Sequence, residues 1–517
     1  MVFFNCGFIE LYELFYCMSG FSFHSSPKCF IFTLHRTLYM QQVEKLFKQF
    51  SNSPITGIDK LPQAGSDRQY YRIKTKGNCY IATVGKNIKE NETFIYFSQL
   101  FTKLKLSTPR LFIVSEDQFT YVQEDFGAQS LLDVVDAKGF SEEVFKLYQK
   151  SLKQLAALQV RAHKEVDYSR CLTNSEFGKE AILADLLYFK YYFLDTLAKP
   201  YYKQKLLNDF NKLSEFLTGS AYKTFMFRDF QGRNILVGAN DDVNFIDYQG
   251  GMKGAPQYDA ASLLWQARAN LPEAWKEKLL TDFIGYFENE TGEKVNADLF
   301  KKQYYGFVLI RLLQVLGAYG FRGLFERKAH FLTSIPLALK NLNEFLSNHN
   351  PGIELSELDK VLQICISNEI IGQFTPFQAT DETPLLVTIN SFSYKKGIPS
   401  DSSENGGGFV FDMRGILNPG RFIEYKTLSG LDKPVKDFLE QQTQMPVFIN
   451  SVFTLIDISV TDYLKRGFAS LMINFGCTGG QHRSVYAAEA LARHLKNKFK
   501  VKTRLTHLNQ QNWLTKN

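Results

Sequence analysis

The pattern of apolar and polar positions divides the first two thirds of the chain into a β-rich part and a longer helical part. Residues 61–82 read as strands around a Gly-Ser turn, residues 90–104 have helical spacing, and residues 112–125 contain two further strand-like runs. Apolar residues then recur at three- and four-residue intervals over 141–217 and again over 260–346. We therefore expect a small lobe built on a sheet, followed by a large helical lobe.

The pattern changes again after this helical part. Residues 348–352 (Asn-His-Asn-Pro-Gly) form a strong break, a short helix is predicted over 355–366, and from residue 385 strands alternate with helices. A separate α/β domain is therefore expected at the C-terminal end. We predict four segments: a non-native or unstructured extension at 1–39, a first domain over 40–350, a linker with a short helix over 351–383, and a second domain over 384–517.

The composition agrees with a soluble protein of several domains. A chain of 517 residues is too long for one ordinary domain, and 45% hydrophobic with 22% charged residues is normal for globular protein. The seven cysteines show neither metal-ligand nor disulfide spacing, which favours a reducing, cytoplasmic compartment. No stretch reaches the roughly 20 apolar residues that span a bilayer, so we expect no membrane span.

The first 39 residues differ from those that follow. Glu10 and Glu13 interrupt their apolar run, and no basic residue precedes it, so they do not resemble a signal peptide. Met40 then opens a polar, amphipathic segment. Our expectation is that residues 1–39 extend a reading frame whose translation starts at Met40.

An Asp-x-x-x-x-Asn motif is the most informative feature of the sequence. Asp229 and Asn234 form it, and an apolar run ending at Asp247 follows. Kinase-type phosphoryl transfer needs one carboxylate that accepts the proton of the attacking hydroxyl, and an amide oxygen and a second carboxylate that hold magnesium. Three such residues in this order, each beside a β-like run, predict phosphoryl transfer.

These residues, together with the order of the lobes, resemble the aminoglycoside phosphotransferase family, and within it the bacterial branch of kinases that act on amino sugars such as N-acetylmuramate. The resemblance covers residues 40–346. It implies an α+β, protein-kinase-like bilobal fold, ATP as phosphate donor and Mg²⁺ as cofactor. On the family pattern Asp229 is the catalytic base, and Asn234 and Asp247 are the magnesium ligands.

Two further positions that match the family pattern are not expected to take part in catalysis. Phe227 stands where the family usually has a histidine of mostly structural role, so its change does not exclude catalysis. Asp259 matches a buried family carboxylate at the start of a helix, and an N-cap is the equivalent interpretation from the residues alone. We expect Asp259 to be structural.

The resemblance places the nucleotide against the first lobe. The turn that contains Gly65, Ser66 and Arg68 would cover the phosphates, because small residues let backbone N–H groups approach them. Glu92 begins a helix and is expected to hold a phosphate-positioning lysine. Glu124 lies in the segment that resembles the hinge, whose backbone would contact adenine.

The lysine itself is missing from its usual strand. Residues 80–84 (Tyr-Ile-Ala-Thr-Val) contain none. Lys86 lies just past the strand, and Arg68 or Arg72 are alternatives. The residue that positions the phosphates therefore stays open at this point.

A second phosphate site is predicted near the C-terminus. An apolar strand pattern over 471–475 leads into a Gly-rich turn over 476–482, and a helix follows. The N–H groups of the turn and the helix dipole favour an anion, and Arg483 would add a bidentate contact. The spacing of Cys477 and Arg483 also resembles protein tyrosine phosphatases, in which a cysteine attacks phosphorus, but Gly476 stands where those enzymes usually place His.

Residues 384–507 more strongly resemble the C-terminal domain of the RNase adapter protein RapZ. The resemblance rests on residues 390–397, 409–414, 429–435 and the Cys477 turn. It implies an α/β domain with a strand, a Gly-rich turn and a helix that form a phosphate nest for an amino-sugar phosphate and, in some relatives, a site for a small RNA. The phosphosugar-binding residues that it implies are Lys395, Arg414, Cys477, Thr478, Gly479, Gly480, His482 and Arg483. His482 alone would fit a structural histidine equally well.

The formal net charge of +7 bears on the RNA. Basic residues cluster over 493–504, and such a surface attracts phosphate or nucleic acid, although a solvated face explains it equally well. Phosphate contacts alone would make RNA binding non-specific and salt-sensitive.

The leading hypothesis is a cytoplasmic, ATP-dependent small-molecule kinase for an amino sugar or cell-wall sugar, fused to a regulatory domain that binds a phosphosugar. Two alternatives remain open. One is a RapZ-like RNA adapter whose kinase lobe only binds nucleotide, which the missing lysine supports. The other is a cysteine-dependent phosphatase at Cys477.

Overall fold

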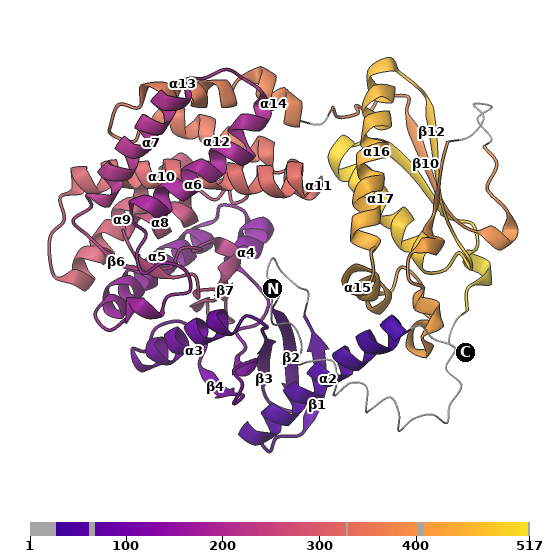
Figure 1. Ribbon diagram of the computed structural model, residues 1–517, viewed down its shortest axis with the longest axis horizontal. Coiled ribbons are helices and arrows are strands. Elements are labelled where there is room, and N and C mark those ends of the chain that lie inside the picture. Colours follow the sequence, from indigo (N-terminus) through magenta and orange to yellow (C-terminus); the bar gives the residue numbers. More distant parts are fainter. Residues whose placement is uncertain (1–26, 62–67, 327–328, 376, 402–407, 515–517) are drawn as a thin grey trace, which may run out of the picture.

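The computed structural model describes residues 27–61, 68–326, 329–375, 377–401 and 408–514. It contains a small sheet lobe, a large helical lobe and an α/β unit with a parallel sheet (Figure 1). The predicted fold class is therefore confirmed. Residues 1–26 lie outside the described part, and the first helix, α2 (Pro27–Phe50), runs through Met40.

The small lobe is a five-stranded antiparallel sheet of order β1-β2-β3-β5-β4. Val43, Leu46 and Phe47 of α2 pack against one face of this sheet. Helix α3 (Ile88–Lys103) begins at the N-cap Asn87, whose side chain accepts from Glu90 N, and its Phe94 joins the main core. The strands are β1 (Ile55–Lys60), β2 (Gln69–Thr75), β3 (Cys79–Val84), β4 (Leu111–Val114) and β5 (Thr120–Glu124).

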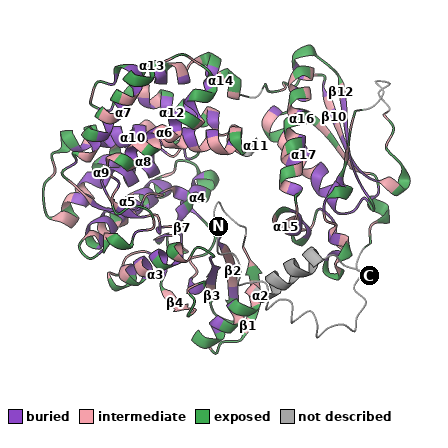
Figure 2. Ribbon diagram, in the orientation of Figure 1, coloured by how far each residue is buried: buried purple, intermediate pink, exposed green. Residues whose placement is uncertain are grey.

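The large lobe is built around two buried helices, α8 and α10 (Figure 2). All eight residues of α8 are buried, so this helix lies inside the lobe. The α-helices of the lobe include α4 (Leu131–Lys138), α5 (Glu142–His163), α6 (Lys179–Tyr192), α7 (Lys203–Thr218), α8 (Gln257–Leu264), α9 (Glu273–Thr291), α10 (Ala297–Gly320), the short α11 (Ala329–Leu332) and α12 (Ile335–Asn348).

Two short antiparallel strand pairs lie between the helices of this lobe. They are β6 (Thr224–Met226) with β9 (Met252–Gly254), and β7 (Ile235–Val237) with β8 (Val243–Phe245). The loops at the ends of these strands carry the Asp229 motif and Asp247. The pairing of β7 with β8 brings the segment after Asp229 next to the segment before Asp247.

The segment predicted as a linker contributes to the first core. It contains α13 (Ser356–Cys365) and α14 (Asn368–Phe374), and Leu358 and Ile370 belong to the same apolar cluster as the large lobe. Asp209 of α7 accepts hydrogen bonds from the first N–H groups of α13, at 2.7 and 2.9 Å. The first apolar core thus extends to Ile370.

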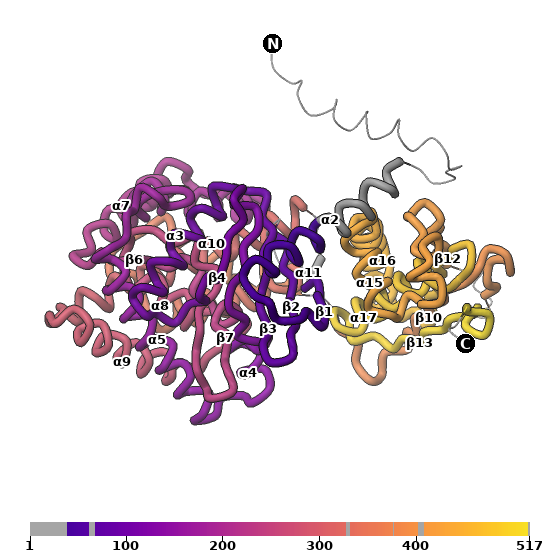
Figure 3. The backbone as a smooth tube through the Cα atoms, turned by 90° about the horizontal axis from the view of Figure 1, so that it is seen from below, coloured from indigo at the N-terminus to yellow at the C-terminus, as the bar shows by residue number. Residues whose placement is uncertain are grey.

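The C-terminal unit is a four-stranded sheet of order β11-β12-β10-β13, in which all three strand pairs are parallel. It has its own apolar cluster, and Figures 1 and 3 show it as a second body. Its main elements are β10 (Leu386–Ser393), β11 (Phe409–Asp412), α15 (Lys433–Gln442), α16 (Met445–Arg466), β12 (Ser470–Cys477), α17 (Arg483–Phe499) and β13 (Lys502–His507).

Two helical stretches are long and apolar enough to cross a membrane by length and composition alone, which core helices can also be. They are Ala297–Phe325 and Met445–Arg466. In the first, 61% of the apolar window is buried inside the protein, as expected for a core helix; in the second the share is 28%.

Candidate functional site

A buried carboxylate holds the loop that carries Asp229 through hydrogen bonds to its backbone. Asp259, fully buried in α8, accepts hydrogen bonds from Phe227 N (2.7 Å) and Arg228 N (2.9 Å), and from Gln159 Nε2 (2.8 Å). It therefore fixes the backbone immediately before Asp229. The N-cap interpretation is wrong in detail, since the N-cap of α8 is Pro256 and Asp259 lies in its first turn, but its role is structural.

The neighbouring side chains hold the same loop. Arg228 has a positive φ of 78° and donates to Tyr258 Oη (2.8 Å) and to both carboxylate oxygens of Asp185 (2.8 and 2.9 Å). Phe227 is fully buried and packs edge-on against Phe230, so an apolar ring occupies the position of the family's histidine. The loop is thus fixed on both sides of Asp229.

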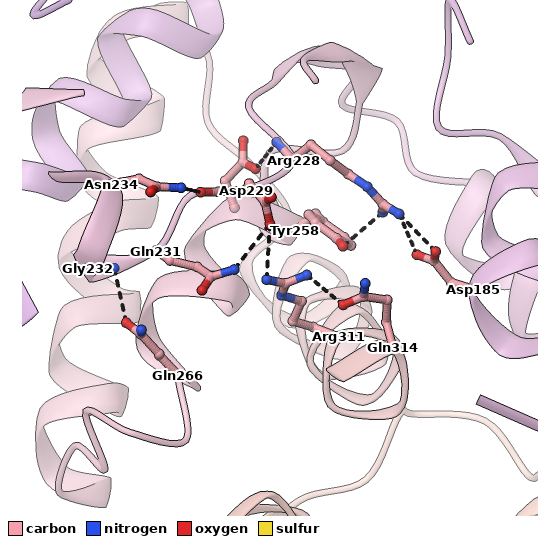
Figure 4. A network of polar contacts seen from close by, with 11 residues as sticks. Asp185, Arg228, Asp229, Gln231, Gly232, Asn234, Tyr258, Gln266, Arg311 and Gln314 are labelled. Atoms are coloured by element: carbon pink, nitrogen blue, oxygen red, sulfur yellow. Dashed lines mark hydrogen bonds and ion pairs between the residues drawn. The ribbon is translucent and has the colours of Figure 1, made fainter. Parts of the chain in front are cut away.

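Asp229 itself faces an opening. Its side chain is 46% exposed, and its Oδ1 accepts from Gln231 Nε2 (3.1 Å) and contacts an arginine of α10, Arg311 (3.4 Å; Figure 4). Loss of hydration would by itself raise the pKa of this carboxyl. The positive charges of Arg311 and, next, Arg233 outweigh this effect and hold the pKa below its usual value. The carboxylate is therefore ionised and can accept a proton.

Asn234 and Asp247 meet across the β7–β8 hairpin. Ile235 pairs with Phe245, so the residues just outside this pair are neighbours, and Ile246 N donates to Asn234 O (3.0 Å). Asn234 Nδ2 donates to the main-chain oxygen of Asp229 (2.9 Å), which turns its Oδ1 away from that bond (Figure 4). The three residues of the motif are thereby brought to one place.

The residues present fit a magnesium ion. Mg²⁺ prefers oxygen ligands and is usually held by one or two carboxylates together with phosphate oxygens and water. Asn234 offers its Oδ1, and Asp247, whose side chain is 35% exposed, offers its Oδ2. Within the described part of the chain, neither oxygen accepts a hydrogen bond from protein.

A buried arginine just before β2, Arg68, lies beside Asp247. Arg68 is 5% exposed, pairs with Asp247 Oδ1 (2.8 Å) and lies 3.3 Å from Glu90 Oε1 on α3. Gln249 Nε2 donates to the same two carboxylates, at 2.9 and 3.3 Å. Arg68 thus joins α3 of the small lobe to the candidate metal ligand.

The expectation that Glu92 forms this pair is corrected. Glu92 is exposed, whereas Glu90, two residues earlier on the same helix, faces Arg68. Two residues correspond to about 200° around a helix, so the two side chains point in opposite directions. Gly65 and Ser66, predicted to cover the phosphates, lie outside the described residues.

The other two candidates for the phosphate-positioning residue lie elsewhere. Arg72 pairs with Asp125 (2.6 Å) and donates to Gly127 O (3.1 Å), so it stabilises the predicted hinge. Lys86 is exposed. Glu124 ends β5, and its carboxylate accepts from Arg110 at 3.1 Å. Its N–H donates to Arg110 O (3.0 Å), so its side chain and its N–H both have partners within the protein.

The Gly-rich turn of the C-terminal unit leads from β12 into α17, as predicted. Gly480 has a φ of 62°, which favours glycine, and its N–H donates to Cys477 Sγ (3.2 Å). Asn509 and Trp513 donate to the main-chain oxygens of Gly479 (2.6 Å) and Gly480 (2.8 Å). Residues near the C-terminus therefore hold the turn by hydrogen bonds, while Thr478 and Gly479 remain exposed.

Arg483 lies beneath this turn without a carboxylate partner among the described residues. It is 4% exposed, and its Nη1 donates to the main-chain oxygens of Arg414 (3.1 Å) and Ile416 (2.7 Å). Its Nε is buried without a hydrogen-bond partner. Burial lowers the pKa of Arg483. A buried guanidinium with an unused N–H fits a phosphate, whose oxygens would satisfy it.

The remaining predicted nest residues differ in position. His482 is buried, its Nε2 contacts Tyr425 O (2.9 Å), and burial lowers its pKa, which suits the structural interpretation. The guanidinium of Arg414 pairs with Asp412 (2.6 Å) and stacks over Tyr394. Lys395 is exposed.

Gly476 explains why the phosphatase pattern is incomplete. A Cβ at this position would lie 2.4 Å from the Tyr394 ring and 2.5 Å from that of Phe392. The histidine usual in phosphatases therefore has no room, and the similarity to those enzymes is limited to the spacing of Cys477 and Arg483.

The two lobes around the Asp229 site have a kinase-like phosphotransferase fold, and a parallel α/β unit follows them in the chain. Residues 58–293 match the sequence model of the phosphotransferase enzyme family, and residues 385–511 match that of the RapZ C-terminal domain. Both resemblances predicted from the motifs are confirmed by these matches.

The curated relatives share only part of this architecture. A nucleotide-binding protein of Clostridium acetobutylicum is 42% identical over 167 residues, which are 32% of this chain and 53% of the relative. A nucleotide-binding protein of Glaesserella parasuis is 33% identical over 185 residues, 35% of this chain and 62% of the relative. The chain thus spans about half the length of the curated relatives it matches.

Similar solved structures include two kinases. The choline kinase LicA from Streptococcus pneumoniae is 16% identical, covers 60% of this chain and 99% of its own, and has a TM-score of 0.40. An ethanolamine kinase of Plasmodium vivax is 12% identical, covers 67% of this chain and 96% of its own, and has a TM-score of 0.43.

Sequence reasoning missed two residues of the site. Arg311 contacts Asp229 from 82 positions away, and its signal is a lone arginine within the apolar run of α10. Glu90 precedes the predicted Glu92 by two residues, and only the phase of α3 separates them.

Proposed function

We propose that the first two lobes form an ATP-dependent, Mg²⁺-requiring kinase that phosphorylates an alcohol group of a small molecule, an amino sugar or cell-wall sugar. The observation that carries this proposal is the convergence of Asp229, Asn234 and Asp247 at the β7–β8 hairpin, with an ionised carboxylate facing an opening. The match to the phosphotransferase enzyme family supports it.

Each residue has a role that follows from its contacts. Asp229 accepts the proton of the attacking hydroxyl, and its low pKa keeps it ready at neutral pH. Asn234 and Asp247 would hold Mg²⁺, which supplies charge neutralisation of the phosphates when bound. Arg68, fixed by Glu90 and Asp247, adds a positive charge at the same edge. Catalysis then rests mainly on positioning and electrostatics.

We further propose that the C-terminal unit binds a phosphosugar at the turn over 477–483, and that the protein acts in the cytoplasm. The unused Nε of Arg483 and the exposed Thr478 and Gly479 support a phosphate ligand there. A unit that binds the product or a related phosphosugar beside a kinase would allow feedback on the reaction.

The test is turnover. Purified full-length protein is screened for ATP consumption against amino sugars, aminoglycosides and choline-like alcohols. Asp229→Asn should lower kcat about 10²–10⁴-fold, since it removes the proton acceptor. Asp241→Asn, an exposed change at the tip of the β7–β8 hairpin, is the matched control and should leave kcat unchanged. Unchanged turnover in Asp229→Asn would exclude this base.

A second candidate is an RNA adapter whose kinase lobe only binds nucleotide. The absence of a lysine from β3 favoured it, but Arg68 now supplies a cation at that place. Binding of a small RNA by the C-terminal unit is a separate proposal. Filter binding over a salt series tests it, with Arg483→Ala as the comparison; a steep salt dependence unaffected by Arg483→Ala would indicate non-specific phosphate contacts.

A further inference from the structure

Two carboxylates and one imidazole meet where the first turns of α9 approach the end of α12. Glu273 and Glu277 belong to α9, and His349 is the C-cap of α12. His349 Nε2 lies 2.5 Å from Glu273 Oε1 and 4.0 Å from Glu277 Oε1. The three ligand atoms all lie within 4.8 Å of one another, and the residues that the structure describes contain no second group of this kind.

Helix geometry and ring packing bring the three side chains to one point. Residues four apart on a helix lie on the same face, so Glu273 and Glu277 both face His349. The ring of His349 stacks on that of Tyr305 (4.2 Å between centroids) and meets Trp265 edge-on (5.7 Å). Tyr305 Oη also donates to Glu277 Oε1. One tyrosine thus holds the imidazole and a carboxylate, and outer-shell partners of this type orient metal ligands.

Negative charge exceeds positive charge around the imidazole. Lys276 Nζ pairs with Glu344 (2.6 Å) and lies 3.5 Å from Glu273 Oε2. Among the described residues, it is the one lysine or arginine that pairs with Glu273, Glu277 or Glu344. With a neutral imidazole, three carboxylates and one lysine leave two negative charges. A divalent cation neutralises this charge, and carboxylates withdrawn from water need such a partner.

A buried hydroxyl beside the carboxylates also lacks a partner. Tyr304 is 1% exposed, and its Oη has no hydrogen bond within the described part of the chain. Burial chiefly, and then the charges of Tyr305, Glu277 and Glu273, raise its pKa, so the phenol lies close to both carboxylates. Water bound to an ion between the carboxylates would provide the hydrogen bond that this hydroxyl lacks.

We infer that Glu273, Glu277 and His349 bind a transition-metal dication such as Zn²⁺, which ties α9 to the end of α12. Zn²⁺ takes imidazole nitrogen and carboxylate oxygen at about 2.0–2.2 Å in a tetrahedral arrangement, in which ligand atoms are about 3.4 Å apart. The separations of 2.5 and 4.0 Å lie on either side of this value, so small side-chain rotations suffice. The ion replaces the proton between His349 and Glu273, and this proton is released to solvent.

The fourth position of such an ion stays open to water, since the side chain of Glu277 is 41% exposed. The imidazole selects against Mg²⁺, which prefers oxygen ligands throughout. The site is independent of the proposed kinase function. It would fix the point at which the large lobe passes into α13.

The experiment is equilibrium dialysis of the full chain, first stripped with EDTA, against Zn²⁺ or Mg²⁺. We expect about one Zn²⁺ per chain to depend on His349 and to bind at micromolar concentration or below, about 100-fold or more tightly than Mg²⁺. Thermal unfolding should show a higher Tm with Zn²⁺, since an ion that binds only the folded chain stabilises it.

The variants assign the ion to its ligands. His349→Gln and Glu277→Gln should each weaken Zn²⁺ binding about 100-fold and remove the rise in Tm. Tyr305→Phe, which removes an outer-shell hydrogen bond, should weaken it about tenfold. Because Glu277 is partly exposed, Glu277→Gln keeps the test valid if His349→Gln fails to fold.

His494→Gln is the matched control. His494 pairs with Asp457 (2.7 Å) and stacks on Phe453, and its side chain is 11% exposed, close to the 12% of His349. The other oxygen of Asp457 binds Lys498 (2.6 Å), and no second carboxylate of the described residues pairs with His494. His494→Gln should therefore leave Zn²⁺ binding unchanged.

Four outcomes would overturn the site. Zn²⁺ binding that survives in both His349→Gln and Glu277→Gln assigns the ion elsewhere, for example to the cysteines. A loss in Asp247→Asn as large as that in His349→Gln assigns it to the Asp229 motif. Binding only at millimolar Zn²⁺, or Mg²⁺ bound as tightly as Zn²⁺, would mean that exposed carboxylates collect cations without forming a site.

Discussion

Arg68 in the first lobe and Arg483 in the C-terminal unit are both almost fully buried, yet they have opposite kinds of partner. Arg68 lies between two carboxylates, Glu90 and Asp247. Arg483 donates to two main-chain oxygens and pairs with no carboxylate of the described residues. The Nε of each arginine lacks a hydrogen-bond partner within the described part of the chain, although that of Arg68 lies 3.3 Å from Glu90 Oε1. Each arginine stands at a site where we propose that phosphate binds.

The partners determine what each cation does. Burial opposes the charge of both, but the tyrosines and carboxylates around Arg68 outweigh this and raise its pKa, whereas burial lowers the pKa of Arg483. Arg68 is therefore a positioning residue that joins α3 to the candidate metal ligand. Arg483 retains an uncompensated positive charge, which an anionic ligand would neutralise.

Of these two arginines, Arg68 is expected to give the larger effect when it is replaced. Arg68→Gln should lower kcat about 10²–10³-fold, the cost of one pre-aligned charge or donor at a reacting centre. Glu90→Gln should have a smaller effect in the same direction. Kinetics with the acceptor found in the turnover screen would measure both.

The matched control is Glu92→Gln, on the exposed side of the same helix. It should change kcat less than twofold, and thermal unfolding of all three variants checks that the lobe remains folded. A loss in Glu92→Gln as large as that in Glu90→Gln would contradict the arrangement of α3 described above.

The case of Glu90 and Glu92 shows how far the sequence could predict this site. Asp229, Asn234 and Asp247 lie within one short stretch beside β-like runs, so their meeting follows from local pairing of β7 and β8. Which of the two glutamates faces Arg68 depends on how α3 is rotated about its own axis. That rotation is set by the packing of α3 against the rest of the protein. Sequence reasoning therefore found the motif and missed its partner.

Contacts between residues far apart in the sequence were harder still to predict. The lobe order and the C-terminal α/β unit followed from hydrophobic periodicity, and both are confirmed. Arg311 reaches Asp229 from α10, and Asp259 binds the loop backbone from α8. Such pairs depend on how helices pack in the large lobe, and periodicity predicts a helix without its neighbours.

A second prediction concerns the uncompensated arginine. Arg483→Gln should weaken binding of glucosamine 6-phosphate about 10–100-fold, since a charged hydrogen bond is lost. It should leave turnover in the first domain nearly unchanged when no phosphosugar is added. Isothermal titration of the full chain provides the measurement.

Arg493→Gln, an exposed change on the same helix, separates the nest from general surface charge. It should alter binding less than twofold. Equal losses in the two variants would mean that the ligand is held by the basic surface, and the contrast between Arg68 and Arg483 would lose its functional meaning.

The smallest expected effect belongs to Arg311, whose position is intermediate between those of the other two arginines. It is buried like both, but its carboxylate partner, Asp229, is the predicted base and lies at 3.4 Å.

The pKa of Asp229 is below its usual value chiefly because of Arg311, so Arg311→Gln should raise the pKa of Asp229. The base acts when deprotonated, and activity is therefore lost as pH falls through this pKa. The acidic limb of kcat/KM should lie below the usual carboxyl range in the unaltered protein and move to higher pH in Arg311→Gln, while the neutral-pH plateau changes little. A pH profile of both proteins, limited to the range in which each stays folded, provides the measurement. A limb that does not move would show that Arg311 does not tune the base.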